Sequence, residues 1–352
     1  MKRILTYINA ALFSCLMFTS CSQDADESMP ASTEHGPYVQ LQLSMPSTDE
    51  FPDASRANSF STGTEGGTFY ENHIIGIEDM SLYIFDCTVP AKPAFLGMAT
   101  DLTFRSFPSS SANPTRGLVE GKLPVSAAGK NVKVVLMVNY ANRGYAVTTP
   151  ALSTAFNDWC KANTFDFGSQ PWQESDQKYI PMSGECTIAV QDLSHLAQTN
   201  YSHIDLRRSV AKVRIRMRDD CQYTIASVGM VNANRLSYCV PMAAFRVPGT
   251  VTDLNPTISQ IQPNNAKQIE FYIPEQKPLA KIKLGMRYAG TDQISEVELE
   301  FKNYVTGRAY NAERNYLYEY VIFKKPLAAL EKLDVRTTVK TWTMHDIGTT
   351  YE

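Results

Sequence analysis

The stretch Tyr38-Val-Gln-Leu-Gln-Leu-Ser-Met45 alternates apolar and polar side chains from its second residue onward. A β-strand points successive side chains to opposite faces, so this period of two predicts a strand with one buried face and one face toward water. The side chains of the buried face are Val39, Leu41, Leu43 and Met45. The run that follows, residues 46–68, is rich in Ser, Thr, Gly, Pro and Asp and predicts an exposed loop, where proteases cut readily.

The same alternation recurs along the chain. Further strands are predicted at 80–87, 132–140, 211–217, 222–231, 268–273, 280–288, 295–302 and 315–323, and short helices at 151–163, 192–198 and 327–333. Lysines on the polar face of 280–288 and glutamates on that of 295–302 predict a hairpin that pairs opposite charges. Many short strands and few helices indicate an all-β protein built of β-sandwiches, and the break near 185–203 indicates two of them.

A basic stripe alternates with the apolar residues of 211–217. Its members are Lys212, Arg214 and Arg216. Long cationic side chains at every second position are typical of a sheet face that water covers, so we expect this stripe to be solvated rather than to form an anion site.

The N-terminus has the pattern of a bacterial secretory leader, which does not belong to the fold. Its apolar core, residues 10–18, is shorter than the roughly 20 residues that a membrane-spanning helix needs. The core ends in Phe18-Thr-Ser-Cys21, which resembles a lipoprotein cleavage box with Phe in place of the usual Leu. A rival box ends at Cys15, but cleavage there would leave a stunted apolar core. We therefore predict a lipoprotein signal peptide at residues 1–20.

Composition excludes several classes of function. The net charge is −3 and no basic face is indicated, so nucleic acid is not an expected partner. The cysteine spacing matches neither a zinc site nor a disulfide scaffold, although a bridge between Cys221 and Cys239 stays open. The five histidines are scattered, and the chain has no nucleophile elbow, metalloprotease motif or phosphate-binding glycine loop. We expect no catalytic residues, no metal and no cofactor, and hence a protein that is not an enzyme.

Several segments together resemble the fimbrillin family of Bacteroidales, the subunits of short and long surface fimbriae. In chain order they are the box ending at Cys21, the first strand before Arg56-Ala57, Ile180-Pro-Met-Ser-Gly184, Leu206-Arg-Arg-Ser-Val-Ala-Lys-Val213, Asn315-Tyr-Leu-Tyr-Glu-Tyr-Val321 and Val339-Lys-Thr-Trp342. Each motif alone is weakly specific, but their order is kept over most of the chain.

The resemblance implies an outer-membrane lipoprotein precursor with two transthyretin-like β-sandwich domains that is exported to the cell surface. The acidic run after Cys21 looks like a surface-export signal of such lipoproteins. An arginine-specific protease then removes the lipid anchor and the first strand. The groove that opens is filled by the C-terminal segment of a neighbouring subunit, which is donor-strand exchange, and a fimbrium grows that supports cell adhesion. The implied partners are other fimbrial subunits, the protease and, before processing, the outer membrane.

Carried onto this sequence, the resemblance assigns a palmitate-type lipid anchor to Cys21. It assigns proteolytic cleavage to the Arg56–Ala57 bond, with Arg116 as the alternative site. The removable strand carries Val39, Leu41 and Leu43, and the candidate donor strand carries Leu333, Val335, Val339 and Trp342. Two other roles stay open, namely a surface-exposed glycan-binding lipoprotein and a non-cleaved fimbrial anchor or tip subunit.

The expected organisation has four parts. Residues 21–56, after the signal peptide at 1–20, form a tether and the removable first strand. Residues 57–190 form an N-terminal β-sandwich domain, and residues 191–352 form a C-terminal β-sandwich domain with an extended C-terminal segment.

Overall fold

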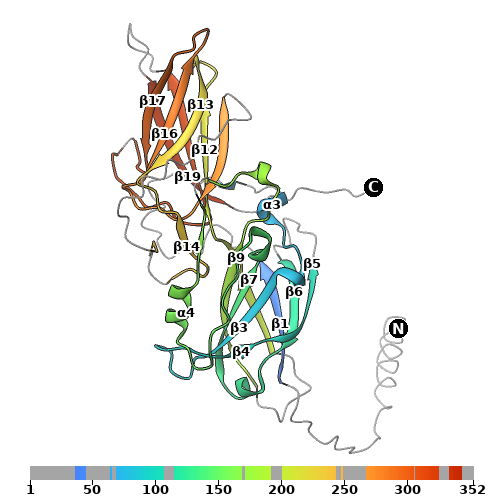
Figure 1. The fold of residues 1–352 in the computed structure, drawn as a ribbon. Helices are drawn as coiled ribbons and strands as arrows, with labels where there is room; N and C mark the ends of the chain where they lie inside the picture. Colours follow the sequence, from blue (N-terminus) through green and yellow to red (C-terminus); the bar gives the residue numbers. More distant parts are fainter. Residues whose placement is uncertain are drawn as a thin grey trace, which may run out of the picture. The chain divides into compact units, whose positions relative to one another are not determined.

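The structure is a computed structural model that describes residues 36–44, 64–65, 69–106, 115–168, 171–191, 200–242, 247–248, 267–304, 306–324 and 333–342. Almost all of its regular secondary structure is β-strand (Figure 1). The described residues contain no helix that is long and apolar enough to cross a membrane. The expected all-β sandwich fold is confirmed, because the larger sheets pack in two pairs around apolar cores.

The first pair of sheets contains the N-terminal strand. One sheet has the order β10-β1-β6-β5 and the other has the order β11-β9-β7-β3-β4. Their bounds are β1 Tyr38–Ser44, β3 Met80–Asp86, β4 Ala94–Met98, β5 Thr100–Ser106, β6 Thr115–Lys122, β7 Asn131–Val138, β9 Met182–Ala189, β10 Asn200–Asp205 and β11 Arg207–Arg208. One cluster of buried apolar side chains draws on both sheets, with members on β1, β3, β6, β7, β9 and β10. The alternating strands therefore each turn one face into a shared core.

The second pair of sheets contains the C-terminal strand. One sheet has the order β15-β12-β18-β19-β2 and the other has the order β13-β16-β17. Their bounds are β2 Thr64–Glu65, β12 Ala211–Met217, β13 Tyr223–Val231, β15 Gln268–Ile273, β16 Lys281–Tyr288, β17 Ile294–Glu300, β18 Tyr316–Lys324 and β19 Leu333–Trp342. A second apolar cluster fills the space between them.

The expected charge-paired hairpin is confirmed in β16 and β17. Lys281 Nζ lies 2.7 Å from Glu298 Oε2, and Lys283 Nζ lies 3.3 Å from Glu296 Oε2. These pairs are partly exposed, so they fix the register of the hairpin more than they stabilise it.

An aromatic cluster covers the other face of the sheet that contains β3 and β7. It gathers side chains from the short helix α4 (Phe156–Ala162) and from β8 (Thr164–Asp166), which pairs with β14 (Leu236–Tyr238) in a small sheet. Trp159 of α4 is 2 % exposed and donates its indole N–H to the carbonyl oxygen of Thr148 at 2.8 Å. Trp159 and Trp172 are thus core residues and not exposed platforms for a sugar.

Several sequence expectations need correction. The helix predicted at 151–163 begins only at Phe156, because Ala155 has an extended backbone. The segment Ile180-Pro-Met-Ser-Gly184 is expected from its sequence to be a turn-bounded piece, but residues 182–184 belong to the long strand β9. The serines and prolines of residues 106–116 predict a loop, but Thr115 and Arg116 begin β6.

Other expectations fall partly outside the described residues, among them the helices at 192–198 and 327–333. The domain limits also stay predictions. Strand β10, Asn200–Asp205, pairs with β1, so the first pair of sheets draws on residues beyond 191.

Three of the cysteines in the described residues, Cys160, Cys221 and Cys239, are buried. Cys221 and Cys239 are free thiols, so the bridge that the sequence left open is not formed. Burial raises the pKa of the Cys160 and Cys239 thiols to about 12, which keeps both protonated and poorly nucleophilic.

The turn after β3 is fixed by an ionised carboxylate. Asp86 Oδ1 accepts a hydrogen bond from the backbone N–H of Thr88 at 2.8 Å, and Asp86 Oδ2 lies 2.9 Å from Lys130 Nζ. The hydrogen bonds from Thr88 and the Lys130 ammonium outweigh partial burial and lower the pKa of Asp86 to about 2.

Candidate functional site

Strand β1 is paired on both of its edges (Figure 1). It runs antiparallel to β6, from Tyr38 opposite Lys122 to Ser44 opposite Thr115. It runs parallel to β10, from Val39 opposite Asn200 to Ser44 opposite Asp205. Removing residues 38–44 would therefore leave two unpaired strand edges that face each other across a single-strand gap. We call this gap, between β6 and β10, the β1 groove.

The apolar side chains of β1 are completely sequestered from water. Val39 is 1 % exposed, and Leu41 and Leu43 are 0 % exposed. Burying three such side chains contributes about 5–9 kcal/mol relative to leaving them in water. The β1 groove is consequently an apolar slot that is costly to leave empty.

Both ends of β1 are anchored by backbone hydrogen bonds beyond the ladder. The N–H of Leu123 donates to the carbonyl oxygen of Pro37 at 2.8 Å, and the N–H of Leu206 donates to that of Ser44 at 2.8 Å. The bonds lie at opposite ends of the strand, so they limit its sliding along the groove.

The outer face of β1 carries polar contacts to both neighbours. Gln40 Nε2 donates to Glu120 Oε1 at 2.7 Å. Ser44 Oγ lies 2.7 Å from His203 Nε2 and also donates to Asp205 Oδ1, and His203 Nε2 lies 2.8 Å from the same carboxylate oxygen. A catalytic triad needs the carboxylate on the imidazole nitrogen opposite the serine, but here both groups meet the same nitrogen. The cluster therefore holds a strand in place and does not build a nucleophile.

Three of the predicted site residues lie outside the described residues. They are Cys21, Arg56 and Ala57, so lipidation and cleavage stay predictions. The alternative cleavage site, Arg116, lies within β6, between the residues paired with Leu43 and Ser44. A protease needs an extended, accessible segment, which a central paired strand does not offer.

The candidate donor strand, β19, pairs in this chain with its own sheet. It lies antiparallel to β18, with Leu333 and Trp342 at its two ends, and among the described strands only the two-residue strand β2 follows it in the sheet order. Val335 and Val339 are half-buried against the second apolar core. β19 is thus held more loosely than β1, whose apolar side chains are fully buried.

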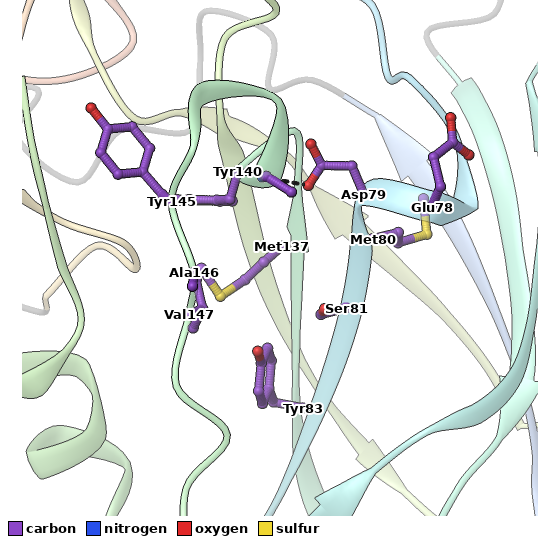
Figure 2. A pocket seen from close by; sticks show the side chains of 11 residues that line it. Glu78, Asp79, Met80, Ser81, Tyr83, Met137, Tyr140, Tyr145, Ala146 and Val147 are labelled. Carbon is purple, nitrogen blue, oxygen red and sulfur yellow. Dashed lines mark hydrogen bonds between the residues drawn. The ribbon is translucent and has the colours of Figure 1, made fainter.

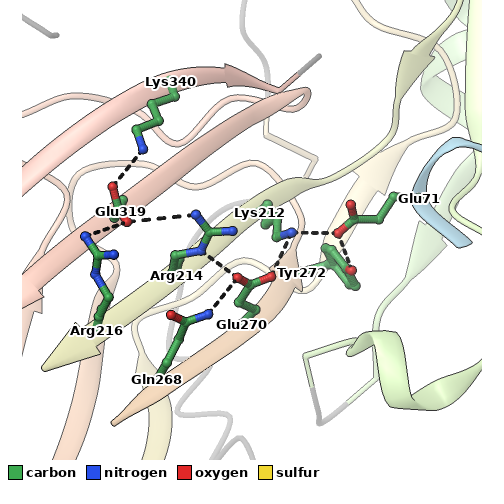
Figure 3. A network of polar contacts seen from close by, with 9 residues as sticks. All are labelled: Glu71, Lys212, Arg214, Arg216, Gln268, Glu270, Tyr272, Glu319 and Lys340. Atoms are coloured by element: carbon green, nitrogen blue, oxygen red, sulfur yellow. Dashed lines mark hydrogen bonds and ion pairs between the residues drawn. The ribbon is translucent and has the colours of Figure 1, made fainter. Parts of the chain in front are cut away.

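A line of alternating charges crosses the sheet that contains β19, and the sequence pattern did not indicate it (Figure 3). Lys212 Nζ lies 2.9 Å from Glu71 Oε1 and 2.7 Å from Glu270 Oε2. The Lys212 and Glu71 side chains are only 2 % and 0 % exposed. The expectation of a solvated basic stripe is therefore wrong for Lys212. Its strand is central, and the short helix α3 (Phe69–Asn72) places a carboxylate against it.

The line continues to β19. Arg214 Nε lies 2.5 Å from Glu270 Oε1, and Glu319 on β18 lies 3.5 Å from Arg216 and 2.9 Å from Lys340 (Figure 3). Burial opposes the ionisation of Glu270, but the two cations beside it hold the pKa of that carboxyl below its ordinary value.

Among the described residues, two of the hollows lie beside the first pair of sheets. One, of about 190 Å³, lies beside Tyr83 and Met137, and Figure 2 shows the carboxylate of Asp79 at its rim. Asp79 accepts hydrogen bonds from the backbone N–H groups of Ala141 and Asn142, both at 2.8 Å, so it fixes a turn. The Asp79 carboxylate thus has a structural role, which is to hold this turn.

The other hollow, of about 440 Å³, lies on the outer face over β1, β6 and β10. It is lined by Gln40, Gln42, Leu118, Tyr201, Ser202 and His203. Within the described residues, no group of three or more His, Cys, Asp or Glu side chains is placed to hold a metal ion.

No family model and no curated protein sequence matches the chain. Among solved structures, the tip fimbrial protein Mfa3 from Porphyromonas gingivalis, with a C-terminal truncation, matches with a TM-score of 0.50 at 15% identity, over 87% of this chain and 100% of Mfa3. A candidate cell adhesion protein from Bacteroides eggerthii matches with a TM-score of 0.50 at 12% identity, over 88% of this chain and 97% of that one. The chain has the β-sandwich fold of these fimbrial and adhesion proteins, which confirms at the level of the fold the resemblance to the fimbrillins.

Proposed function

We propose that this protein is a structural subunit of a cell-surface fimbria, assembled by donor-strand exchange after proteolytic removal of β1, and that the fimbria supports adhesion. The observation that carries the proposal is the position of β1. It is an N-terminal strand, paired on both edges, with three fully buried apolar side chains. Taking it away would leave a slot of the shape and chemistry that another strand fills by β-strand addition.

The burial of the two strands indicates the direction of the exchange. In its own sheet, β19 pairs mainly with β18 and keeps Val335 and Val339 half-buried. In the β1 groove a strand pairs on two sides and buries its apolar face completely. The acceptor groove and the donor strand lie at different places on one molecule, so the contact between copies is heterologous and does not close. Repetition of that contact builds a fibre.

Processing and anchoring complete the proposal. A lipid on Cys21 holds the precursor on the outer membrane, and an arginine-specific protease hydrolyses the Arg56–Ala57 bond. This cut releases the anchor together with residues 38–44. The subunit then leaves the membrane for the fimbrium, where its partners are further copies and accessory subunits.

The decisive experiment identifies the N-terminal residue of the protein recovered from the cell surface. We expect Ala57, and we expect Arg56→Ala to block processing while the matched variant Arg116→Ala does not. Normal processing of Arg56→Ala would refute the assigned bond. A lipid-carrying Cys21 on the wild-type surface protein would instead indicate a non-cleaved anchor subunit.

A surface glycan-binding lipoprotein is the second candidate, and the hollow on the outer face of the first sheet pair favours it. Tyr201 there is 72 % exposed and stands beside the amide side chains of Gln40 and Gln42. An exposed aromatic ring with nearby amides is a common arrangement for holding a sugar. A glycan binder should stay monomeric and lipid-anchored after exposure to the protease, and Tyr201→Ala should abolish its retention on glycan resin. A fimbrial subunit should form ladders on unboiled gels.

A further inference from the structure

We propose that the β1 groove selects its donor strand by charge, and that the occupant is β19 of a second copy, with Val335 in the place of Val39. This inference rests on the proposed function and adds the register in which β19 pairs with β6 and β10 of the acceptor. In that register Arg336 lies beside Glu120 and Lys340 lies beside Asp205. It follows from the acidic residues beside the groove and the spacing of the cations on β19.

Two carboxylates flank the outer face of the groove. Glu120 on β6 lies opposite Gln40 and accepts its amide hydrogen bond at 2.7 Å. Asp205 on β10 lies opposite Ser44 and accepts its hydroxyl hydrogen bond. The groove thus presents two negative charges at positions that are four residues apart along β1. The β1 side chains that contact these carboxylates, Gln40 and Ser44, are neutral.

The polar face of β19 carries cations at the same spacing. Arg336 and Lys340 are four residues apart, and Val335 and Val339 match the spacing of Val39 and Leu43. When Val335 takes the place of Val39, Arg336 replaces Gln40 and Lys340 replaces Ser44. Both hydrogen bonds that β1 makes to the carboxylates then become ion pairs at a partly buried site.

The neighbouring registers lose this match. A shift of two residues that brings Leu333 to the place of Val39 sets Asp334 against Glu120, which places like charges together. The opposite shift of two residues sets Thr338 against Glu120 and leaves no ion pair at that carboxylate. A shift of one residue turns Arg336 into the apolar floor of the groove.

Packing alone does not select the register, because the middle apolar site of the groove is imperfectly filled in the proposed register. Thr337 would take the place of Leu41 and is smaller, so it leaves part of that site unfilled. Charge is then the feature that distinguishes the registers.

The departure of β19 leaves no uncompensated charge behind. Lys340 pairs with Glu319 at 2.9 Å in the monomer, but Glu319 also lies 3.5 Å from Arg216. Arg336 packs over the ring of Phe323, with the guanidinium carbon 5.8 Å from its centroid, and is exposed. Glu319 therefore keeps a cation after exchange, while Glu120 and Asp205 each gain one.

A cysteine cross-link tests the register directly. In the proposed register Thr338 takes the place of Gln42, which lies opposite Leu118. The double variant Leu118→Cys/Thr338→Cys, purified as the full chain and treated with an arginine-specific protease, should give oxidised ladders that survive boiling without reductant. Leu118→Cys/Arg336→Cys reports the register shifted by two residues and should not cross-link. The parent protein with its native cysteines gives the background.

Exchange of the charges provides the second test. Glu120→Lys and Arg336→Glu each replace an attraction by a repulsion and should lower the yield of unboiled ladders about tenfold. The double variant should restore the yield, whereas Glu296→Lys, in the β16–β17 hairpin, should leave it unchanged. Thermal melting of the unprocessed chains verifies that each variant folds.

The outcomes separate this inference from the proposed function. If processed wild-type protein forms no ladders, the proposed function fails, and the register fails with it. If ladders form but Leu118→Cys/Thr338→Cys does not cross-link, or the double charge variant does not recover, the register is wrong while donor-strand exchange stands.

Discussion

Replacing Leu41 by alanine should destabilise the precursor and leave the assembled fibre unaffected. Leu41 is the central apolar residue of β1 and is 0 % exposed. If β1 is removed during assembly, its side chains contribute to the stability of the precursor only. The matched control is Leu82→Ala on β3, because Leu82 is also 0 % exposed and belongs to the same apolar cluster.

The size of the effect follows from the burial. A buried leucine replaced by alanine lowers the free energy of unfolding by about 2–5 kcal/mol, because transfer energy is lost and a cavity remains. Leu41 lies in a strand with neighbours on both edges, which restricts the collapse of that cavity. We therefore expect a loss of about 3 kcal/mol or more in the precursor.

The assay compares unfolding before and after protease treatment. Urea unfolding followed by circular dichroism gives the midpoint for the precursor, and heating followed by gel electrophoresis gives the temperature at which ladders dissociate. Leu41→Ala should lower the first value alone, whereas Leu82→Ala should lower both. Ladders of Leu41→Ala that dissociate as early as those of Leu82→Ala would show that β1 stays in the fibre and would refute the reasoning.

Three further predictions concern features that the fold depends on. Glu71→Gln should lower the free energy of unfolding by about 3 kcal/mol, which is the lower end for a broken buried ion pair, because a second carboxylate remains beside Lys212. Adding Lys212→Met should recover much of this loss, since no unpaired buried charge is then left. Urea unfolding of the double variant would contradict this reasoning if the two losses simply add. The lowered pKa of Asp86, about 2 against an ordinary value of 3.8, stabilises the fold above pH 4, and this contribution disappears as the pH falls toward 2. Asp86→Asn should thus be less stable at pH 7 and lose less stability between pH 4 and pH 2, as melting temperatures across that range would test. Peptide mapping without reduction should recover Cys221 and Cys239 as separate thiols, and a linked peptide pair would contradict the structure.

The strands that the sequence predicted best were those with strict alternation. The stretch 38–45 appears as β1, Tyr38–Ser44, and 211–217 appears unchanged as β12. Period-two patterning is a local property, because each strand must turn one face to a core whichever strands lie beside it. Strands with interrupted patterns, such as β5 and β6, were missed or placed in loops, since glycines and charged residues break their alternation.

The buried charges show where local pattern fails. Lys212 has the sequence context of a solvated face, yet its side chain is 2 % exposed because Glu71, 141 residues earlier in the chain, lies against it. The contacts of Ser44 also depend on the tertiary structure, because Ser44 contacts His203 and Asp205 only when β1 and β10 are neighbours.

The sequence by itself determined that this chain is an all-β protein, which segments alternate, and that the first and last strands could each cover an apolar edge. Only the tertiary structure decided that β1 lies between β6 and β10, that β19 rests half-buried on its own sheet, and that Glu120 and Asp205 flank the groove. The physical reason is how far apart in the sequence the interacting residues lie. Side-chain alternation is written in neighbouring residues, whereas strand order and register depend on contacts between segments about 80 to 160 residues apart, which no local pattern encodes.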